Sequence, residues 1–340
     1  MWWINMKKFN AIDLFSGAGG LSFGFEQAGI NTAVAVEFNP IYAKSFQQNF
    51  PDAEVYVGDI RNISDEQILE YKDKYSIDII IGGPPCQGFS LAGNIGRRFL
   101  DDDRNRLFLE YLRFVRIIKP KMFVLENVAA MVTHNKGRTI SEIIDSFTEL
   151  GYSLKYQVLN AVNYCVPQER RRVFIIGMLN ENTFVFPDKD SNIISISQAI
   201  GDLPVLSSGE SSNIPLHQAM NHSKQMLQKM GFVSDGGSRM DIPAEIRPRS
   251  GDVRKYIRYN SKLPSVCVTG DMRKIFHYSQ NRALTCRELA RLQTFPDTYM
   301  FCGSSIEIQQ QIGNAVPCML AYAIAKECVK ALSNERIPQN

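Results

Sequence analysis

The amino-acid sequence predicts an α/β protein built on a doubly wound, mostly parallel sheet, with a second, smaller domain. Apolar strand-like runs alternate with longer helical stretches through the first 180 residues, as in a parallel sheet that carries helices on both faces. A chain of 340 residues that is 44% hydrophobic is long enough for two domains with a sizeable core. We expect residues 1–187 to form the first domain, 303–340 to complete it, and 188–302 to form the smaller one.

Six apolar segments account for the expected strands. They span residues 9–15, 31–37, 53–59, 77–83, 121–127 and 172–178. The C-terminal stretch CMLAYAIAKECVKAL is apolar at helical spacing, which predicts a helix that packs back on the first domain. In sheets of this kind, ligands bind outside the carboxyl ends of the strands. The residues that close the strands are therefore the first candidates for a functional site.

Composition excludes membrane, secreted and metal-dependent classes. No apolar run approaches the roughly 20 residues of a membrane span, and the N-terminus lacks the apolar segment of a secretory signal. We therefore expect a cytoplasmic protein. The seven cysteines and four histidines are scattered and include no C-x-x-C pair, so we expect neither a disulfide framework nor a metal site.

The ends of the first three expected strands carry groups that suit a nucleoside. Gly17 and Gly19 allow a tight strand-to-helix turn that exposes backbone N–H groups. The turn departs from the dinucleotide fingerprint G-x-G-x-x-G because its sixth position is Ser22. Glu37 suits both hydroxyls of a ribose, and Asp59 suits the exocyclic amine of an adenine. Together these residues predict a nicotinamide or an adenosyl cofactor.

The fourth expected strand ends in GGPPCQGFS, residues 82–90, which contains one thiol, Cys86. A thiol is a poor nucleophile while it is mostly protonated, so a catalytic cysteine must be activated by its surroundings. The two prolines stiffen the approach to Cys86 and the glycines let other groups come close, which a merely buried cysteine does not need. Cys86 is therefore our predicted nucleophile. The charged, glycine-containing stretch 93–106 that follows is interpreted as a mobile lid.

Positive charge is concentrated in one part of the chain. Residues 236–285 carry a net charge of +6, against +3 for the whole protein. Three tyrosines, Tyr256, Tyr259 and Tyr278, are interleaved with these cations. This pattern is typical of a surface that binds the phosphates of an anionic polymer. The cations are Arg239, Arg247, Arg249, Arg254, Lys255, Arg258, Lys262, Arg273, Lys274 and Arg282.

Six motifs follow one another along the chain: FSGAGG, GGPPCQGFS, ENV (126–128), QERRR (168–172), RELARLQTFPD (287–297) and GNAVP (313–317). In their order and spacing the chain resembles the DNA (cytosine-5) methyltransferases of bacterial restriction-modification systems. Two departures affect only local loop geometry. Cys318 stands where the family often has a second proline, and HYSQNR (277–282) lacks a proline that often follows the histidine.

The resemblance implies the S-adenosylmethionine-dependent methyltransferase fold and a role for each strand end. Cys86 would add to C6 of cytosine, because C5 accepts a methyl group only after the ring becomes an enamine. Glu126 would contact N3 and the exocyclic amine, and Arg172 would lie beside O2, with Arg170 as a further catalytic cation. No metal takes part, and the product would be S-adenosylhomocysteine. The residues expected to hold S-adenosylmethionine are Phe15, Gly17, Gly19, Glu37, Phe38, Asp59, Ile60, Pro85, Leu107 and Asn314.

The resemblance also assigns the smaller domain to target recognition. Its cations would hold phosphates of double-stranded DNA, and a few loop side chains would read base edges in the major groove. The target cytosine would rotate out of the stack into the pocket of Cys86. We expect a monomer, and a cognate restriction endonuclease that acts on the same DNA site without needing to bind the methyltransferase.

Three alternatives remain at this point. An RNA methyltransferase would keep the same catalytic residues, but the long basic region favours DNA. A catalytically inactive binding protein would not need Cys86, Glu126, Arg170 and Arg172 together. A nicotinamide-dependent dehydrogenase is disfavoured by the incomplete glycine fingerprint.

Overall fold

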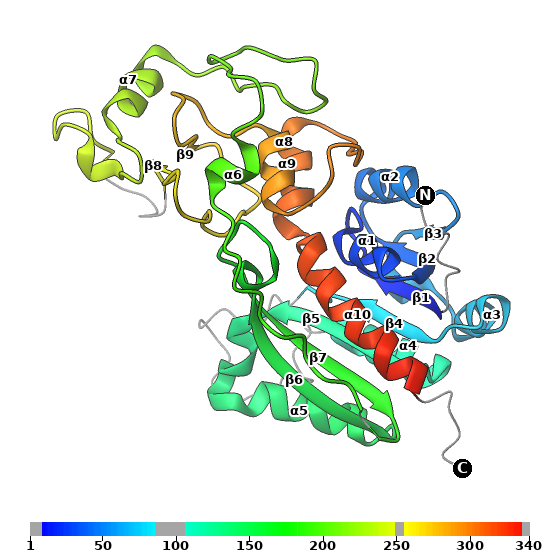
Figure 1. Ribbon diagram of the computed structural model, residues 1–340. Helices are drawn as coiled ribbons and strands as arrows, with labels where there is room; N and C mark the ends of the chain where they lie inside the picture. Colours follow the sequence, from blue (N-terminus) through cyan, green and yellow to red (C-terminus); the bar gives the residue numbers. More distant parts are fainter. Residues whose placement is uncertain (1–8, 86–105, 182, 249–254, 335–340) are drawn as a thin grey trace. The chain divides into compact units, whose positions relative to one another are not determined.

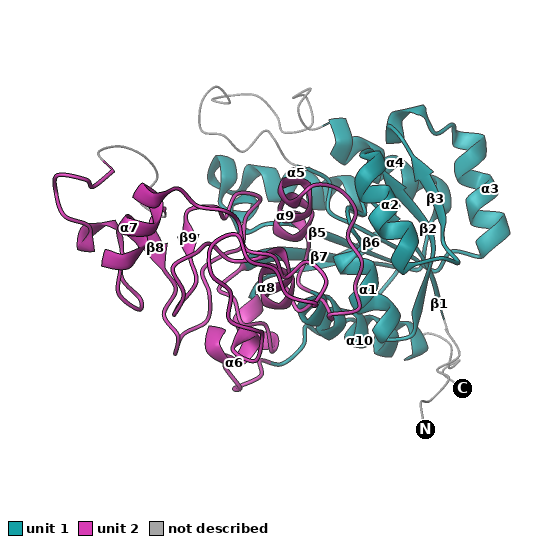
Figure 2. Ribbon diagram, turned by 90° about the horizontal axis from the view of Figure 1, so that it is seen from above, with its two compact units in different colours: residues 1–160, 171–188, 318–340 teal, residues 161–170, 189–317 magenta. Residues whose placement is uncertain are grey.

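The computed structural model describes residues 9–85, 106–181, 183–248 and 255–334. The chain divides into two compact units, coloured separately in Figure 2. Unit 1 comprises Met1–Asn160, Arg171–Asp188 and Cys318–Asn340, and unit 2 comprises Ala161–Arg170 and Lys189–Pro317. The division after residue 188 lies beside the boundary we expected. Residues 161–170 and 303–317, which we assigned to the first domain, belong to unit 2.

The helices and strands of the two units are as follows. Unit 1 contains β1 (Phe9–Leu14), α1 (Gly20–Gln27), β2 (Ile30–Glu37), α2 (Pro40–Asn49), β3 (Glu54–Val57), α3 (Asp65–Tyr75), β4 (Ile79–Gly82), α4 (Arg106–Ile118), β5 (Met122–Val128), α5 (Arg138–Thr148), β6 (Tyr152–Asn160), β7 (Arg171–Leu179) and α10 (Cys318–Asn334). Unit 2 contains α6 (Ile196–Ile200), α7 (Lys224–Phe232), β8 (Ile257–Arg258), β9 (Ile275–Phe276), α8 (Cys286–Leu292) and α9 (Ser305–Asn314).

In the described part of unit 1, seven strands form one sheet in the order β3-β2-β1-β4-β5-β7-β6. Strands β1 to β5 pair in parallel, and β7 runs antiparallel to both β5 and β6. The doubly wound, mostly parallel sheet is therefore confirmed, and each of the six expected segments overlaps an observed strand. We did not expect β6, an edge strand whose central residues are exposed, because it contains no continuous apolar run.

Helices lie on both faces of the sheet (Figure 1). Side chains from α3, α4 and α5 form one buried cluster with the strands. Within it the Tyr111 hydroxyl donates to the carbonyls of Ile80 and Val124, at 3.2 and 2.9 Å, and so ties α4 to two neighbouring strands. Helix α1 packs instead against α10, where the backbone approach leaves no room for a side chain at Gly24 against Ala321. The C-terminal helix thus packs on the first unit, as predicted.

Buried cations stabilise unit 2. Arg282 and Glu288 form an ion pair at 2.6 Å, with both side chains almost completely buried, and Glu288 also closes a capping box with Thr285 at the start of α8. The guanidinium of Arg258 is buried too, and it donates to oxygens of Met230, Val233, His277, Gln280 and Asn281. Both arginines therefore serve the interior of this unit, because a buried guanidinium is tolerated only where its donors are satisfied.

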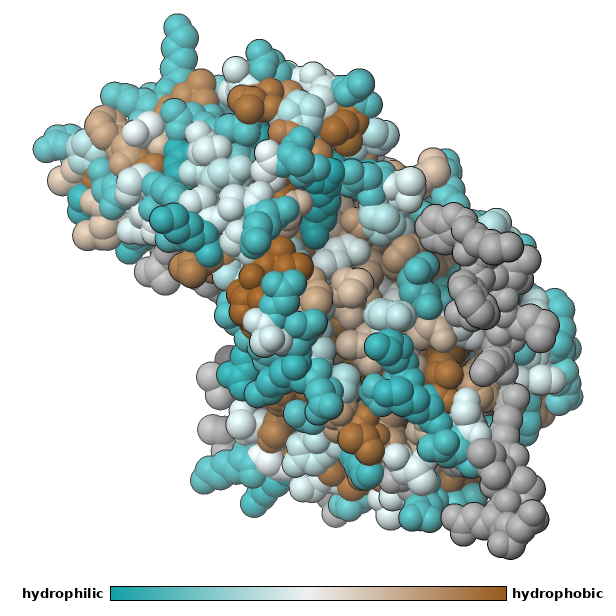
Figure 3. All heavy atoms as spheres, viewed as in Figure 1, coloured by the Kyte–Doolittle hydropathy of each residue, from teal (hydrophilic) through white to brown (hydrophobic). Residues whose placement is uncertain are grey.

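Hydrophobic residues on the face shown in Figure 3 form small groups among hydrophilic ones. Within the described ranges, no helix combines the length and the apolar character that a membrane crossing requires.

Candidate active site

The site predicted from the sequence falls where the strand order reverses. Strands β1 and β4 are neighbours in the sheet, and Leu14 lies opposite Gly82. From β1 the chain adds β2 on one side of this pair, and from β4 it adds β5 on the other side. Loops at the carboxyl ends of two such strands form the usual ligand-binding crevice of a doubly wound sheet. The loops FSGAGG and GGPP therefore begin side by side. Cys86 itself lies outside the described residues.

The turn after β1 is tight. Phe15, Gly17 and Gly19 all adopt left-handed φ values of 63°, 57° and 92°, and Gly19 is the N-cap of α1. The backbone N–H of Gly17 donates to a carboxylate oxygen of Glu37 at 2.8 Å, which links the turn to the end of β2. The glycine turn and Glu37 are thus brought together, as the sequence predicted.

Glu37 is 8% exposed and each of its carboxylate oxygens accepts one backbone N–H, from Gly17 and from Asn39, both at 2.8 Å. Burial raises the pKa of Glu37, and these backbone hydrogen bonds oppose the rise. Each oxygen retains a second lone pair, so both can still accept a ligand hydroxyl. Beside it, Phe38 is 71% exposed and Val57 of β3 is 50% exposed. An apolar surface therefore borders a fixed carboxylate.

The other predicted cofactor residues have less uniform positions. Asp59 caps a 3-10 turn, Ile60–Asn62, and both of its carboxylate oxygens accept hydrogen bonds from Arg61, so the pKa of Asp59 is lowered. Ile60 is 3% exposed and belongs to the core, so its side chain offers little surface to a ligand. Leu107 is half-buried against the same core. Asn314 is an exposed residue at the end of α9 in unit 2, and Pro85 is exposed in unit 1.

A carboxylate and a guanidinium meet at the ends of β5 and β7. A carboxylate oxygen of Glu126 lies 2.9 Å from Nε of Arg172, and the two side chains are only 13% and 17% exposed. Antiparallel pairing places Val128 opposite Arg172 and so brings the two together. A side chain at Gly83 would meet Glu126, since a Cβ there would lie 2.8 Å from a carboxylate oxygen. The GGPP segment thus runs directly beside this ion pair.

Asn127 is a residue of this site that sequence reasoning did not single out. Its buried side-chain amide donates to the carbonyl of Pro84 at 3.0 Å, and its amide oxygen accepts from the N–H of Val128 at 2.9 Å. The side chain after Glu126 therefore holds the backbone of the proline segment. Asn127 could have been found from the sequence by its place in the ENV motif.

Arg170 differs from Arg172 in its burial and its contacts. It is 1% exposed, belongs to unit 2, and donates to the carbonyls of Val268 and Gly313, both at 2.9 Å. These contacts correct our expectation of a catalytic cation, because a guanidinium buried against backbone carbonyls positions those segments and does not contact a substrate. We therefore treat Arg170 as a positioning residue.

Gln168, also missed, connects three of the sequence motifs within unit 2. Its buried side-chain amide donates to the side-chain oxygen of Gln293 at 2.9 Å, and its oxygen accepts from the N–H of Val268. Gln293 in turn donates to the carbonyl of Ile312 at 2.6 Å and to that of Ala315, within GNAVP, at 3.2 Å. QERRR, RELARLQTFPD and GNAVP are therefore joined by one hydrogen-bond network in unit 2.

A buried acid lies beneath the glycine turn. Asp13 of β1 is 1% exposed and accepts a 2.6 Å hydrogen bond from the hydroxyl of Ser22 on α1. Burial raises the pKa of Asp13 from 3.8 to about 7, the nearby charge of Glu37 adds to the rise, and the Ser22 hydroxyl opposes it. The sequence signal for this site was an acid inside FNAIDLF, a segment whose other residues, except Asn10, are apolar.

Asp13→Asn should change how stability depends on pH. In the wild type the raised pKa means that the folded state holds a proton on Asp13 more tightly than the unfolded state does. This contribution to the free energy of unfolding is fully present below the unfolded pKa of 3.8 and is lost as the pH rises through the folded pKa of about 7. The asparagine amide cannot ionise, so its free energy of unfolding should not show this loss. Between pH 4 and pH 8 the free energy of unfolding of the variant should therefore rise by about 4 kcal/mol relative to that of the wild type. Urea unfolding at several pH values measures this, and a pH-independent difference would show that Asp13 does not titrate there.

The basic stretch presents fewer free cations than its charge predicted. Arg258 and Arg282 are buried, and Tyr259 is only 3% exposed, so these three do not belong to a phosphate-binding surface. Lys255 and Arg273 both pair with Asp271. Arg249 and Arg254 lie outside the described residues.

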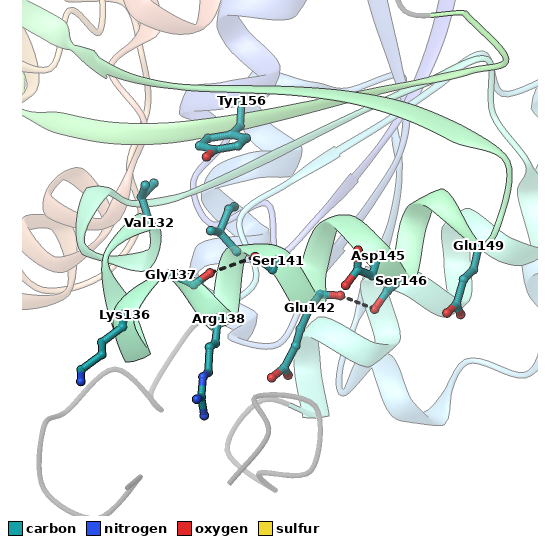
Figure 4. Close-up of a pocket in the computed structure, with 11 residues that line it drawn as sticks. Val132, Lys136, Gly137, Arg138, Ser141, Glu142, Asp145, Ser146, Glu149 and Tyr156 are labelled. Carbon is teal, nitrogen blue, oxygen red and sulfur yellow. Dashed lines mark hydrogen bonds between the residues drawn. The ribbon is translucent and has the colours of Figure 1, made fainter. Parts of the chain in front are cut away.

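One pocket of about 850 Å³ lies between α5, the preceding turn and β6 (Figure 4). Lys136 and Arg138 lie at one end, and Glu142, Asp145 and Glu149 follow along α5. None of the predicted catalytic or cofactor residues lines it, so this pocket is separate from the strand-end site.

Comparison with solved structures defines the class of protein. A chain described as a prophage-encoded DNA modification methyltransferase (E. coli) superimposes with a TM-score of 0.78 at 26% identity, covering 96% of this chain and 100% of that one. The methyltransferase EhMeth of Entamoeba histolytica gives a TM-score of 0.68 at 20% identity, over 96% of this chain and 99% of that one, and shows the same fold. The class is that of the methyltransferases.

The chain belongs to the C-5 cytosine-specific DNA methylase family, whose model matches residues 9–330. It is 54% identical over 325 residues to the Type II methyltransferase M1.HphI of Haemophilus parahaemolyticus, covering 95% of this chain and 87% of that protein. It is 35% identical over 369 residues to M.DdeI of Desulfomicrobium norvegicum, covering 93% and 88%. The predicted DNA (cytosine-5) methyltransferase of the restriction-modification type is thereby confirmed, and the dehydrogenase alternative is wrong.

Proposed function

We propose that this enzyme transfers a methyl group from S-adenosylmethionine to C5 of a cytosine that is flipped out of duplex DNA, through a covalent bond between Cys86 and C6. The observation that carries the proposal is the Glu126–Arg172 pair beside the GGPP segment. A carboxyl group and a cation there suit the N3 edge and the O2 of a cytosine whose C6 faces the residue after Pro85.

The residues divide the reaction among them. The Cys86 thiolate forms a bond to C6, and the electron pair of the C5–C6 double bond moves into the ring, where Glu126 donates a proton to N3. S-adenosylmethionine, when bound, would supply the methyl group to C5, with its S–CH3 bond breaking and S-adenosylhomocysteine leaving. The C5 proton would then pass to a solvent base, which restores the C5–C6 double bond and expels the Cys86 thiolate, and the N3 proton would return to Glu126. Arg172 stabilises the charge on O2 and holds Glu126 in place.

The strand-end residues fit an adenosyl cofactor. Glu37 is fixed by two backbone N–H groups and keeps lone pairs for the ribose hydroxyls. Phe38 offers an exposed ring against which an adenine can stack. Asp59 is the proposed acceptor for the adenine amine, which must share that carboxylate with Arg61.

We further propose that unit 2 is the target recognition domain. Its remaining exposed cations would hold phosphates, and flipping would bring the cytosine to the site because C5 and C6 are inaccessible inside a stacked duplex. The protein would act as a monomer, and a cognate endonuclease would cut the same sequence when it is unmethylated.

Expression in a host without cytosine methylation, followed by mapping of 5-methylcytosine across its DNA, tests the function. We expect methylation of one cytosine within one short sequence, and none when the host carries Cys86→Ser. Calorimetry should detect S-adenosylmethionine binding and no NAD binding. Unmethylated host DNA, together with activity on transfer RNA in vitro, would overturn the proposal in favour of an RNA substrate.

A further inference from the structure

Residues 234–241, SDGGSRMD, form a loop of unit 2 that we call the glycine loop, in which Gly237, Ser238 and Arg239 are half-buried and the other residues are exposed. It follows α7 and is held by bonds to a distant segment: the N–H and hydroxyl of Ser261 donate to the two carboxylate oxygens of Asp235, at 2.8 and 2.6 Å. The backbone is fixed as well, since the N–H of Arg258 donates to the carbonyl of Gly237 at 3.0 Å. The loop is therefore presented in one conformation.

A second set of bonds closes the loop on itself. The N–H and hydroxyl of Ser234 both donate to the same carboxylate oxygen of Asp241, at 3.2 and 3.0 Å. Any side chain at Gly237 would collide with that carboxylate. Both acids of the loop are thus engaged in bracing it. Preorganisation of this kind lowers the entropy that a loop loses on binding.

The braced loop carries one cation, Arg239, beside an apolar residue, Met240, that is 61% exposed. In the described part of the chain, the guanidinium of Arg239 has no hydrogen-bond or ion-pair partner. Every other described arginine of 236–285 is engaged: Arg258 and Arg282 are buried, Arg273 pairs with Asp271, and Arg247 donates to the carbonyls of Ile242 and Met240. Of the arginines of 236–285 that the structure describes, Arg239 is the one left for a partner outside the chain.

We propose that Arg239 reads a guanine of the recognition sequence in the major groove, an inference that rests on the proposed role of unit 2. A guanidinium forms two parallel hydrogen bonds with O6 and N7 of guanine, the pairing that best distinguishes this base. A contact to a base edge needs a fixed backbone, because the two hydrogen bonds must meet two particular atoms. An arginine on a mobile loop could bind a phosphate just as well as one on a fixed loop, but a phosphate contact carries no sequence information. Met240 would lie against the neighbouring base.

The test is methylation by Arg239→Ala and Arg239→Gln on DNA libraries in which each base of the mapped wild-type site is varied. Arg239→Ala should lower kcat/KM on the cognate site by about 5- to 150-fold and remove the preference at one guanine only. Arg239→Gln should shift that position toward adenine, because glutamine pairs with N6 and N7 of adenine. Both variants should keep the wild-type melting temperature, since Arg239 has no partner to lose among the described residues.

Lys262→Ala is the matched control, an exposed cation of the same stretch outside the glycine loop. It should weaken binding equally on all sequences and reduce the log–log salt slope by about one. If Arg239→Ala behaves in the same way, with every base preference intact, Arg239 contacts a phosphate and the proposal is wrong. If the wild type itself methylates no defined sequence, the proposed function fails before this inference is reached.

Discussion

DNA that carries 5-fluorocytosine at the target position is expected to become covalently attached to this enzyme through Cys86. The thiolate can still add to C6 and the methyl group can still transfer, but restoring the double bond would then require loss of a fluorine cation in place of a proton. The adduct should therefore accumulate. It should resist denaturation, require S-adenosylmethionine, and map by peptide mass to Cys86, the thiol that follows the GGPP segment beside Glu126.

Cys86→Ser is the matched control for the trap. A serine hydroxyl has a far higher pKa than a thiol and is scarcely ionised at neutral pH, so this variant should form no adduct and show no methylation, yet still bind DNA. Six other cysteines lie elsewhere in the chain and provide an internal comparison. An adduct at any of them, or full activity of Cys86→Ser, would refute the assignment of the nucleophile.

Glu126→Gln should lower kcat by about 100- to 1,000-fold and leave the affinity for DNA nearly unchanged. The glutamine keeps the shape of the side chain but cannot give N3 a proton as charge develops in the ring. Loss of the proton donor therefore raises the energy of the transition state more than that of the bound ground state. Single-turnover kinetics and equilibrium DNA binding, measured on the same preparation, separate the two effects.

A lower kcat of Glu126→Gln has a second explanation, loss of stability, which can be tested separately. Glu126→Gln leaves the half-buried Arg172 without its carboxylate, which could lower stability. Thermal unfolding of the variant should therefore accompany the kinetics, with Glu70→Gln, an exposed acid of α3, as the control for loss of one negative charge. Equal losses in DNA affinity and kcat would assign Glu126 to binding alone. The 5-fluorocytosine adduct should also form more slowly in Glu126→Gln than in the wild type.

Local sequence patterns were sufficient for six of the seven strands described in the sheet of unit 1 and for the acids at the ends of three of them. Strands covered on both faces carry continuous apolar runs whether their neighbours are parallel or, as for β7, antiparallel, so these segments were visible without a structure, and Glu37, Asp59 and Glu126 stood out as charges that end such runs. The same reasoning missed β6, whose middle is exposed and whose partner, β7, is joined to it through a segment of unit 2. The signal that β6 does carry is the alternation of apolar and polar residues in YSLKYQV, which a search for continuous apolar runs passes over.

The sequence by itself determined the fold class, the strand-end carboxylates and, through six ordered motifs, the family. Only the tertiary structure decided which cations are available, because a charge count does not distinguish a guanidinium in water from one that satisfies buried carbonyls. Arg170 and Arg172 are two positions apart in one motif, yet the first donates to backbone carbonyls in unit 2 and the second pairs with Glu126 in unit 1. Long-range packing, which places each acceptor, made that distinction.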